Sequence, residues 1–312
     1  MKIRLPMLLI AGFLLACRPD PGFVAHKLTR CMVYDISDSA PEFTRIHDEG
    51  DVAYYGLILQ ATGQRELRDY LLAKKRDHLW EYNWDYGVTA EDSAIVMDGL
   101  LSSGVKPAQL LASAERISRE YYVQSSGGFR TVLNPRSAYW DKASVVTTGH
   151  IAWLLRQISP VEFSGQTESA ARFLQKTQLP DGSWKGEWFP SRTIPSYYSL
   201  RFLATNRLAY ASELRRGTEY LRGNQQADGS WSNSVIETSA AILGLQAADN
   251  PGFKKEIEQG RHWLREKIRH SVQGEAVLYY WFERKGSKSR EFLHCSDLGE
   301  VTKAWALLAL KD

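Results

Sequence analysis

Cysteine, excess charge and strand-forming patterns are all scarce in this chain. Of its 312 residues, three are cysteines, and the formal net charge is only +3. Two basic residues, Lys2 and Arg4, lie in an N-terminal segment that we expect to be removed, which leaves 37 basic against 36 acidic residues. A balance this even excludes the broad basic surface that nucleic-acid binding needs. Because alternating apolar and polar runs are also rare, we expect a fold built from helices.

The N-terminal hydrophobic segment is too short to cross a membrane. It runs from Leu5 to Leu15 after the positive Lys2 and Arg4, whereas a spanning helix needs about 20 apolar residues. This arrangement is typical of an export signal. The ending Leu14-Leu15-Ala16-Cys17 resembles a bacterial lipobox, in which the cysteine is acylated, for example with palmitate, and becomes the mature N-terminus. Acyl chains on Cys17 would anchor the protein to a membrane.

The lipobox gives a first division of the chain. We expect residues 1–17 to be a lipoprotein signal peptide, residues 18–45 a tether with an N-terminal segment, and residues 46–312 one domain. Arg18 rather than Asp follows the cysteine, which by resemblance to Gram-negative lipoproteins favours the periplasmic face of the outer membrane. The alternatives are an ordinary signal peptide and an N-terminal anchor helix.

Two cysteines remain in the mature chain, Cys31 and Cys295. In an oxidising compartment such a pair suggests a disulfide. Closing so long a loop is worth roughly 4–5 kcal/mol in the chain-entropy model. Two free buried thiols are the alternative.

One short motif occurs twice. Gln178–Phe189 reads QLPDGSWKGEWF, and Gln225–Trp231 reads QQADGSW, so that the two motif tryptophans are 47 positions apart. A degraded copy, QSSGGF, occupies Gln124–Phe129. We expect Gln to cap the preceding helix, Asp-Gly to form a turn and Trp to pack back. Each copy then acts as a clasp between helix pairs.

Buried and amphipathic helices alternate along the chain. Apolar or small residues fill all sides of six segments: Asp51–Thr62, Thr89–Ser103, Ala143–Ile158, Ile194–Thr205, Val235–Ala248 and Leu298–Leu310. One charged face marks the segments between them: Glu66–Trp80, Lys106–Tyr121, Gln166–Thr177, Ser212–Arg222 and Phe253–Ile268. Helices apolar on all sides are buried, and helices with one apolar stripe cover them. The pattern predicts an all-α (α/α)6 toroid with six inner and about six outer helices.

The two motifs are QW motifs, and their surroundings extend a resemblance to known proteins. DGSWKGEW followed by IPSYYSLRFLA, ADGSW followed by VIETSAAILGL, and the later EVTKAWALLAL are similar to repeats of squalene–hopene cyclases. The resemblance covers roughly residues 80–310. It implies the toroid of the terpenoid cyclases and protein prenyltransferases, and an activity of the class II terpene or triterpene cyclase type.

In class II cyclases an Asp-x-Asp-Asp motif at the start of an inner helix protonates an alkene. This chemistry needs a carboxylic acid kept neutral beside a second carboxyl. The resemblance places Glu91 at the position of the acid and Asp92 beside it, with Thr89 in place of the first Asp. The alternative is a capping box formed by Thr89 and Asp92. Similar boxes occur at Ser234-x-x-Glu237 and Asp297-x-x-Glu300.

Aromatic residues gather near the expected start of several inner helices. Their faces could stabilise carbocations, stack on sugars or hold a lipid chain. The alternative is that they only pack the loops over the mouth of the barrel. We expect the following to contact substrate: Tyr82, Trp84, Tyr86, Trp140, Trp188, Tyr197, Tyr198 and Tyr280.

A prenyltransferase-like zinc site would need Asp, Cys and His ligands around the cavity. His294, Cys295 and Asp297 offer these residue types, but in the order Cys-x-Asp instead of Asp-x-Cys. Neighbouring residues also rarely reach one tetrahedral ion. We therefore expect no metal and no cofactor, and we expect His150 to be a core residue with its hydrogen bonds satisfied.

Three functions are consistent with the sequence. The first is an exported, lipid-anchored cyclase-like enzyme for an isoprenoid or other apolar substrate. The second is a non-catalytic cell-envelope lipoprotein that binds a lipid, glycan or protein in the toroid. The third is a polysaccharide lyase or hydrolase, for which Arg192 and Arg201 would supply cationic groups.

Overall fold

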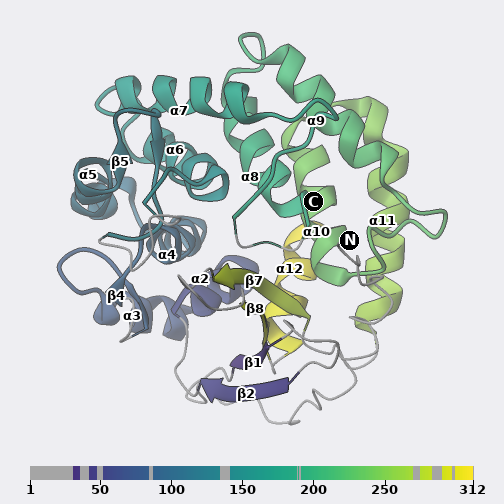
Figure 1. Ribbon diagram of the computed structural model, residues 1–312, viewed down its shortest axis with the longest axis horizontal. Helices are drawn as coiled ribbons and strands as arrows, with labels where there is room; N and C mark the ends of the chain where they lie inside the picture. The colour runs from purple at the N-terminus through teal and green to yellow at the C-terminus, as the bar shows by residue number, and fades with distance from the viewer. Residues whose placement is uncertain are drawn as a thin grey trace.

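A computed structural model describes most of the expected domain. The described residues are 31–35, 42–47, 52–83, 87–133, 141–187, 189, 191–269, 275–282, 290–296 and 299–311. Helices dominate them and form two concentric layers around one axis (Figure 1). The predicted signal peptide, with Cys17, lies outside these residues.

The inner layer is a closed ring of six helices. Each contacts the next in the chain, and the last contacts the first. The six are α2 (Val52–Thr62), α4 (Ala90–Ser102), α6 (Val145–Ile158), α8 (Thr193–Leu203), α10 (Val235–Ala247) and α12 (Gly299–Leu310). Their apolar residues lie on all sides because both the axis and the outer layer cover them. The predicted toroid and its six inner helices are confirmed.

The outer layer consists of amphipathic helices that turn one apolar stripe inward. Within the described ranges they are α3 (Arg65–Lys74), α5 (Leu111–Glu120), α7 (Ser164–Thr177), α9 (Ala211–Gly223) and α11 (Lys254–Ile268). Short 3-10 helices lie at η2 (Pro107–Leu110), η4 (Ala204–Asn206) and η5 (Pro251–Phe253). Since inner and outer helices alternate, all inner helices run in the same direction and their N-termini share one end of the ring. Among these described helices, none has the length and hydrophobicity of a membrane span.

A four-stranded antiparallel sheet, not predicted from the sequence, is drawn at the lower edge of the ring in the view of Figure 1. Its order is β2 (Glu42–His47), β1 (Cys31–Asp35), β8 (Arg290–Ser296) and β7 (Ala276–Phe282). Two ribbons pair β3 (Glu81–Asn83) with β4 (Gly87–Val88) and β5 (Tyr122–Val123) with β6 (Gly128–Phe129). The large sheet joins the two ends of the chain, so no local pattern marks it.

The sheet brings the strands of the two cysteines together. The β1–β8 register pairs Cys31 with Ser296 and Met32 with Cys295. The two cysteines therefore lie on neighbouring strands, one residue out of register. The disulfide stays a prediction.

The repeated tryptophans hold each outer helix to the following inner helix. The indole Nε1 of Trp184 donates to the carbonyl of Leu174 on α7 (2.8 Å), and its backbone N–H donates to Ser196 on α8 (3.2 Å). Trp231 makes the same two bonds, to Leu221 on α9 (2.7 Å) and Thr238 on α10 (2.9 Å). Both indoles are fully buried. The predicted packing of Trp is confirmed.

The glutamine of each motif bonds to the next outer helix. Gln178 also forms the expected C-cap of α7, where its backbone N–H donates to the carbonyl of Leu174 (3.1 Å). Gln178 Nε2 donates to the carbonyls of Gly182 (2.9 Å) and of Glu213 on α9 (3.0 Å). The turn residue Gly182 has φ +88°, and a Cβ there would overlap the backbone carbonyl of Arg216 on α9. Only glycine suits a position that is both left-handed and this close to a neighbouring helix.

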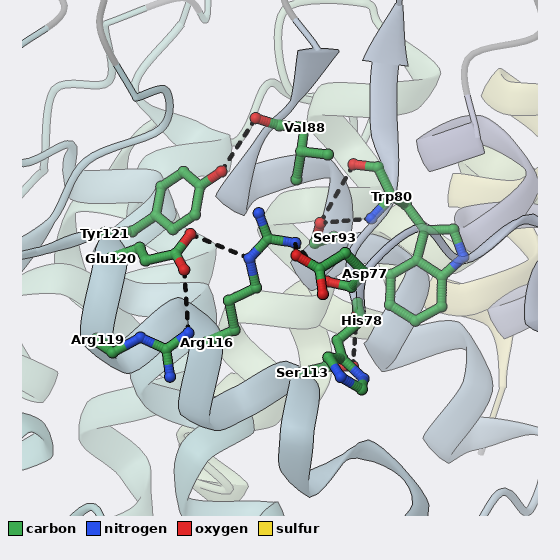
Figure 2. Close-up of polar contacts among 10 residues, drawn as sticks. All are labelled: Asp77, His78, Trp80, Val88, Ser93, Ser113, Arg116, Arg119, Glu120 and Tyr121. Carbon is green, nitrogen blue, oxygen red and sulfur yellow. Dashed lines mark hydrogen bonds and ion pairs between the residues drawn. The ribbon is translucent and has the colours of Figure 1, made fainter.

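A further copy of the clasp, missed in the sequence, lies at Asp77–Trp80 (Figure 2). Trp80 donates through its indole to Leu71 on α3 (2.7 Å) and through its backbone to Ser93 on α4 (3.1 Å). His78 takes the glycine position with φ +71°, and its carbonyl accepts a bond from Ser113 on α5 (2.6 Å). Because His78 stands where the other copies have glycine, the sequence does not indicate a turn here. The outer helix expected over Glu66–Trp80 therefore ends earlier in the structure, at Lys74.

Candidate active site

Glu91 interrupts a repeated hydrophobic position at the N-terminal end of the inner ring. The second residue of α6, α8 and α10 is Val146, Ile194 and Ile236, and all three are buried, whereas α12 also has a glutamate, Glu300, at this position. The second residue of α4 is Glu91, which is only 7% exposed. Burying a carboxyl where the fold accepts an aliphatic side chain opposes folding. This position is therefore a candidate for function.

Glu91 lies on the side of α4 that faces the ring axis. It precedes Asp98 by seven residues, two helical turns, so the two share a helix face. Asp98 bonds to His150 and Arg201 on two other inner helices, which shows that this face looks inward. The Glu91 carboxylate accepts a hydrogen bond from the hydroxyl of Thr147 on α6 (3.1 Å). Thr131 lies 2.6 Å from the Thr147 hydroxyl and supports this contact.

Among the described residues, Thr89 caps the start of α4 through Asp92, without the reciprocal backbone bond of a full capping box. Thr89 Oγ1 accepts a bond from the backbone N–H of Asp92 (3.1 Å), and the Thr89 hydroxyl also bonds to the Asp92 carboxylate. Asp92 is 9% exposed. Burial raises its pKa to about 6, although the bonds from Thr89 and the backbone act in the opposite direction. Glu91 and Asp92 are thus adjacent buried carboxyls, one on the axial face and one in the cap.

The Asp92→Asn variant should reveal this raised pKa as a pH-dependent stability difference. The native pKa exceeds the unfolded value, so the native protein binds more protons between about pH 4 and pH 6. The stability that Asp92 contributes is present below pH 4 and lost as pH rises through 6. Relative to D92N, the wild type should lose on the order of 3 kcal/mol between pH 4 and pH 7.5.

Urea denaturation of both proteins across this pH range measures that difference. Burial lowers the pKa of His150 and gives an opposing slope, but this slope is common to both proteins and cancels in the comparison. A wild-type minus D92N difference that does not vary with pH would contradict a raised Asp92 pKa.

Other carboxyls at the same end act as caps. Glu237, at the third position of α10, accepts a hydrogen bond from Ser191, before the start of α8. Glu275 accepts bonds from the backbone N–H groups of Val235 (2.7 Å) and Ile236 (3.1 Å) at the start of α10. Burial raises the pKa of both carboxyls. Only half of the box predicted at Ser234 and Glu237 is present: Ser234 Oγ accepts from the backbone N–H of Glu237, but the backbone N–H of Ser234 donates to the carbonyl of Trp231. Asp297 lies outside the described residues.

A buried ion pair crosses the middle of the ring. The Arg201 guanidinium, on α8, makes two bonds to the Asp98 carboxylate, one of them at 3.0 Å, and His150 Nε2 lies 3.1 Å from Asp98. Burial alone would raise the pKa of Asp98, but Arg201 and the hydrogen bonds hold it well below its usual range. The guanidinium also lies 3.4 Å from the ring centre of Trp153. Asp98 is therefore a structural anion rather than a proton donor.

His150 is a core residue, as predicted, but only one of its two ring nitrogens, Nε2, has a hydrogen-bond partner among the described residues. Its ring is buried and stacks on Tyr198, with 4.5 Å between the ring centres. Its Nδ1 atom has no hydrogen-bond partner among the described residues. Those same residues contain no group of His, Cys, Asp and Glu side chains arranged to hold a metal.

The predicted aromatic site is described only in part. Tyr197 and Tyr198 lie in the middle of α8, buried against the core and away from the helix N-termini, and Tyr197 contacts Trp305 on α12. Tyr82 lies on β3 and Tyr280 on β7. Four of the predicted residues lie outside the described part of the chain: Trp84, Tyr86, Trp140 and Trp188.

Arg192 and Arg201, the pair considered for a lyase, lie at opposite ends of α8. Arg192 is half exposed and pairs with Asp181 of the clasp (2.6 Å). Arg201 pairs with the buried Asp98. The structure does not bring the two arginines into one site.

Sequence comparison relates the middle of the chain to triterpene cyclases. Residues 132–235 match the family model of the squalene-hopene cyclase C-terminal domain. The chain is 31% identical over 120 residues to a lanosterol synthase of Saccharomyces cerevisiae. The aligned region covers 33% of this chain and 16% of the relative. It is 22% identical over 224 residues to the squalene–hopene cyclase of Bradyrhizobium diazoefficiens, in an alignment that covers 63% of this chain and 33% of the relative. The chain therefore spans a third or less of the length of these relatives.

Solved structures of type II terpene cyclases share the fold. The R337A variant of MstE from Scytonema, in complex with geranylgeranyl dihydroxybenzoate, superposes with a TM-score of 0.66 at 17% identity, over 97% of this chain and 96% of that one. The ent-copalyl diphosphate synthase from Streptomyces platensis gives 0.60 at 20% identity, over 83% and 49%. The resemblance to the terpenoid cyclase toroids that the QW motifs indicated is confirmed.

Proposed function

We propose that the protein is an acid-initiated cyclase acting on an isoprenoid or a similar apolar substrate. The observation that carries this proposal is the buried Glu91 carboxyl, which faces the axis where the neighbouring inner helices carry aliphatic residues. Protonation of an alkene needs an acid shielded from water. The relatives of the chain are cyclases, which agrees with such a role.

In the proposed reaction Glu91 supplies the proton. The neutral Glu91 carboxyl transfers its proton to one carbon of the alkene, which leaves a carbocation and the Glu91 carboxylate. A second alkene of the substrate attacks the cation and closes a ring. Transfer of a proton from the product cation to the Glu91 carboxylate then restores a double bond and the neutral acid. The Thr147 hydroxyl, 3.1 Å from Glu91, can stabilise the carboxylate formed.

Asp92 and the aromatic residues have supporting roles in this proposal. Asp92 lies next to the acid, and burial raises its pKa to about 6, so it is a second weakly acidic carboxyl beside Glu91. Aromatic faces lower the energy of a nearby cation. The side chains proposed for this role are Tyr82, Trp84, Tyr86, Trp140, Trp188 and Tyr280.

The Glu91→Gln variant tests the proposal. Removal of the proton donor should lower turnover of a linear isoprenoid at least about a hundredfold, as expected for loss of general acid catalysis, with product formation followed by mass spectrometry. Glu237→Gln is the matched control, because Glu237 is equally buried at the start of α10. It should keep its activity. Equal activity of E91Q and wild type would refute Glu91 as the acid.

A binding protein without catalysis is the second candidate. The observed bonds between Thr89 and Asp92 fully account for Asp92 as a helix cap. In this case D92N would retain ligand binding and E91Q would cost no function. Wild-type protein that releases every tested isoprenoid unchanged would favour this candidate.

We further propose that acylated Cys17 anchors the domain to the periplasmic face of the outer membrane. The lipobox-like Leu14–Cys17 sequence supports this proposal. Cells fed an alkyne analogue of palmitate should label the wild-type protein and not a Cys17→Ser variant. Equal labelling of both would contradict acylation at this residue.

A further inference from the structure

The ring axis opens into a second site at the end opposite Glu91. A cavity of about 470 Å³ is lined by residues from five of the six inner helices or the turns that follow them. Gln60, Arg201, Gln246 and Leu308 come from the last turns of α2, α8, α10 and α12. Glu91 and Asp92 begin the first turn of α4 and are not in the lining. The cavity is therefore distinct from the proposed acid site.

The Asp98–Arg201 pair forms the inner limit of this cavity. Arg201 lines the cavity while both of its terminal nitrogens bond to Asp98. One face of its guanidinium lies against Trp153. The pair therefore separates the cavity from Glu91, which lies two helical turns before Asp98 on the same face of α4.

One of the two cations in the lining is neutralised by a carboxylate. Arg201 is neutralised by Asp98, and the other cation, Lys311, donates to the backbone carbonyl of Gln60 at the end of α2 (2.6 Å). None of the lining residues is an Asp or a Glu. Four inner helices direct the negative ends of their dipoles toward this opening. An anionic ligand would therefore meet an opposing field, with Lys311 as the one lining cation that pairs with no carboxylate among the described residues.

The walls combine apolar surface with an unpaired hydrogen-bond acceptor. Leu243 and Leu308 supply aliphatic surface. The amide oxygen of Gln246 is buried and has no hydrogen-bond partner in the described part of the chain. Rotation about the broad terminal torsion of glutamine can turn this oxygen toward the cavity. A ligand hydroxyl could then donate to Gln246 and accept from a remaining Arg201 N–H group.

We infer that this cavity binds a neutral, mainly apolar molecule that ends in a hydroxyl group. The apolar part of the lining, which includes Leu243 and Leu308, contacts its body, and Gln246 recognises the hydroxyl at the polar end. The inference does not depend on catalysis at Glu91, because Glu91 is not in the lining.

Calorimetric titration with three probes of equal chain length tests the inference. Dodecanol, dodecanoate and dodecane, each delivered from cyclodextrin, differ only at one end. Dodecanol should bind about tenfold more tightly than either of the others, the difference expected for one or two satisfied hydrogen bonds. Tighter binding of dodecanoate, or equal binding of all three, would overturn the proposed ligand chemistry.

Variants assign the binding to the cavity. Gln246→Leu should remove the preference for dodecanol over dodecane, whereas Gln259→Leu, on the exposed side of α11, should leave it unchanged. Leu243→Trp should fill the cavity and abolish binding of all probes, with circular dichroism checking that the variant is folded. Binding that survives L243W, or a dodecanol preference that survives Q246L, would overturn the site.

The E91Q variant separates this inference from the proposed enzyme. It should bind dodecanol like the wild type, even though its turnover is lost. If E91Q abolished dodecanol binding, the cavity would not be independent of the acid site, and the inference would fail. If E91Q kept both binding and turnover, the cavity would stand and the proposed function would fail.

Discussion

Replacement of Arg201 by Met is expected to lower the free energy of unfolding by about 3–5 kcal/mol, because it leaves the Asp98 carboxylate buried without its cation. Asp98 is 2% exposed and Arg201 15% exposed, so water cannot replace the lost partner. The pair also joins α4 to α8 across the ring, and its two residues are 103 positions apart in the sequence. Urea denaturation at pH 7.5 measures the loss.

Arg192→Met is the matched control for this measurement. Arg192 precedes α8 and also pairs with an aspartate, but its side chain is 45% exposed and that of Asp181 is 46% exposed. An exposed pair contributes at most about 1 kcal/mol. Similar losses of stability in both variants would contradict the argument that R201M leaves the Asp98 carboxylate buried and unpaired.

The double variant Asp98→Asn with Arg201→Met should be more stable than R201M alone. The amide removes the unpaired charge and leaves only the lost packing and hydrogen bonds. A double variant no more stable than R201M would mean that the cost arises from lost packing on Trp153, which the guanidinium covers.

Truncation of Trp231 to Ala should destabilise the protein by about 3–5 kcal/mol, the range for loss of a large buried aromatic side chain. Trp231 is 1% exposed and is bonded to both α9 and α10. Its ring also lies against Gly260 on α11. The cavity left by Ala would therefore loosen three helices at once, and thermal and urea unfolding both measure this.

Trp231→Phe separates packing from hydrogen bonding. Phe keeps most of the ring volume but cannot donate to the Leu221 carbonyl, so the loss should be about 1–2 kcal/mol. The copy at Phe129 shows that the fold accepts this residue, since its backbone N–H still bonds to Thr148 (2.8 Å). A loss in W231F as large as in W231A would indicate that the indole N–H dominates the clasp.

Local chemistry explains why the sequence predicted the ring so well. The Asp-Gly turns, the apolar helices and the cap at Thr89 depend on residues close together in the chain, and all three are observed. The exception is Asp77–Trp80, where His78 adopts the left-handed conformation usually taken by glycine. A repeated Ser or Thr at the fourth position of the inner helices, such as Ser93 and Ser196, could have revealed that clasp.

The sequence by itself determined the helical repeat, the order of inner and outer helices and the position of Glu91 at a helix start, because each follows from neighbours within one or two turns. Only the tertiary structure decided that Asp98 meets His150 and Arg201, that the axial cavity opens at the far end, and that β1 pairs with β8. These contacts join segments 52 to more than 200 residues apart. These long-range contacts form only when the folded chain brings distant segments together, and no local sequence pattern indicates which segments meet.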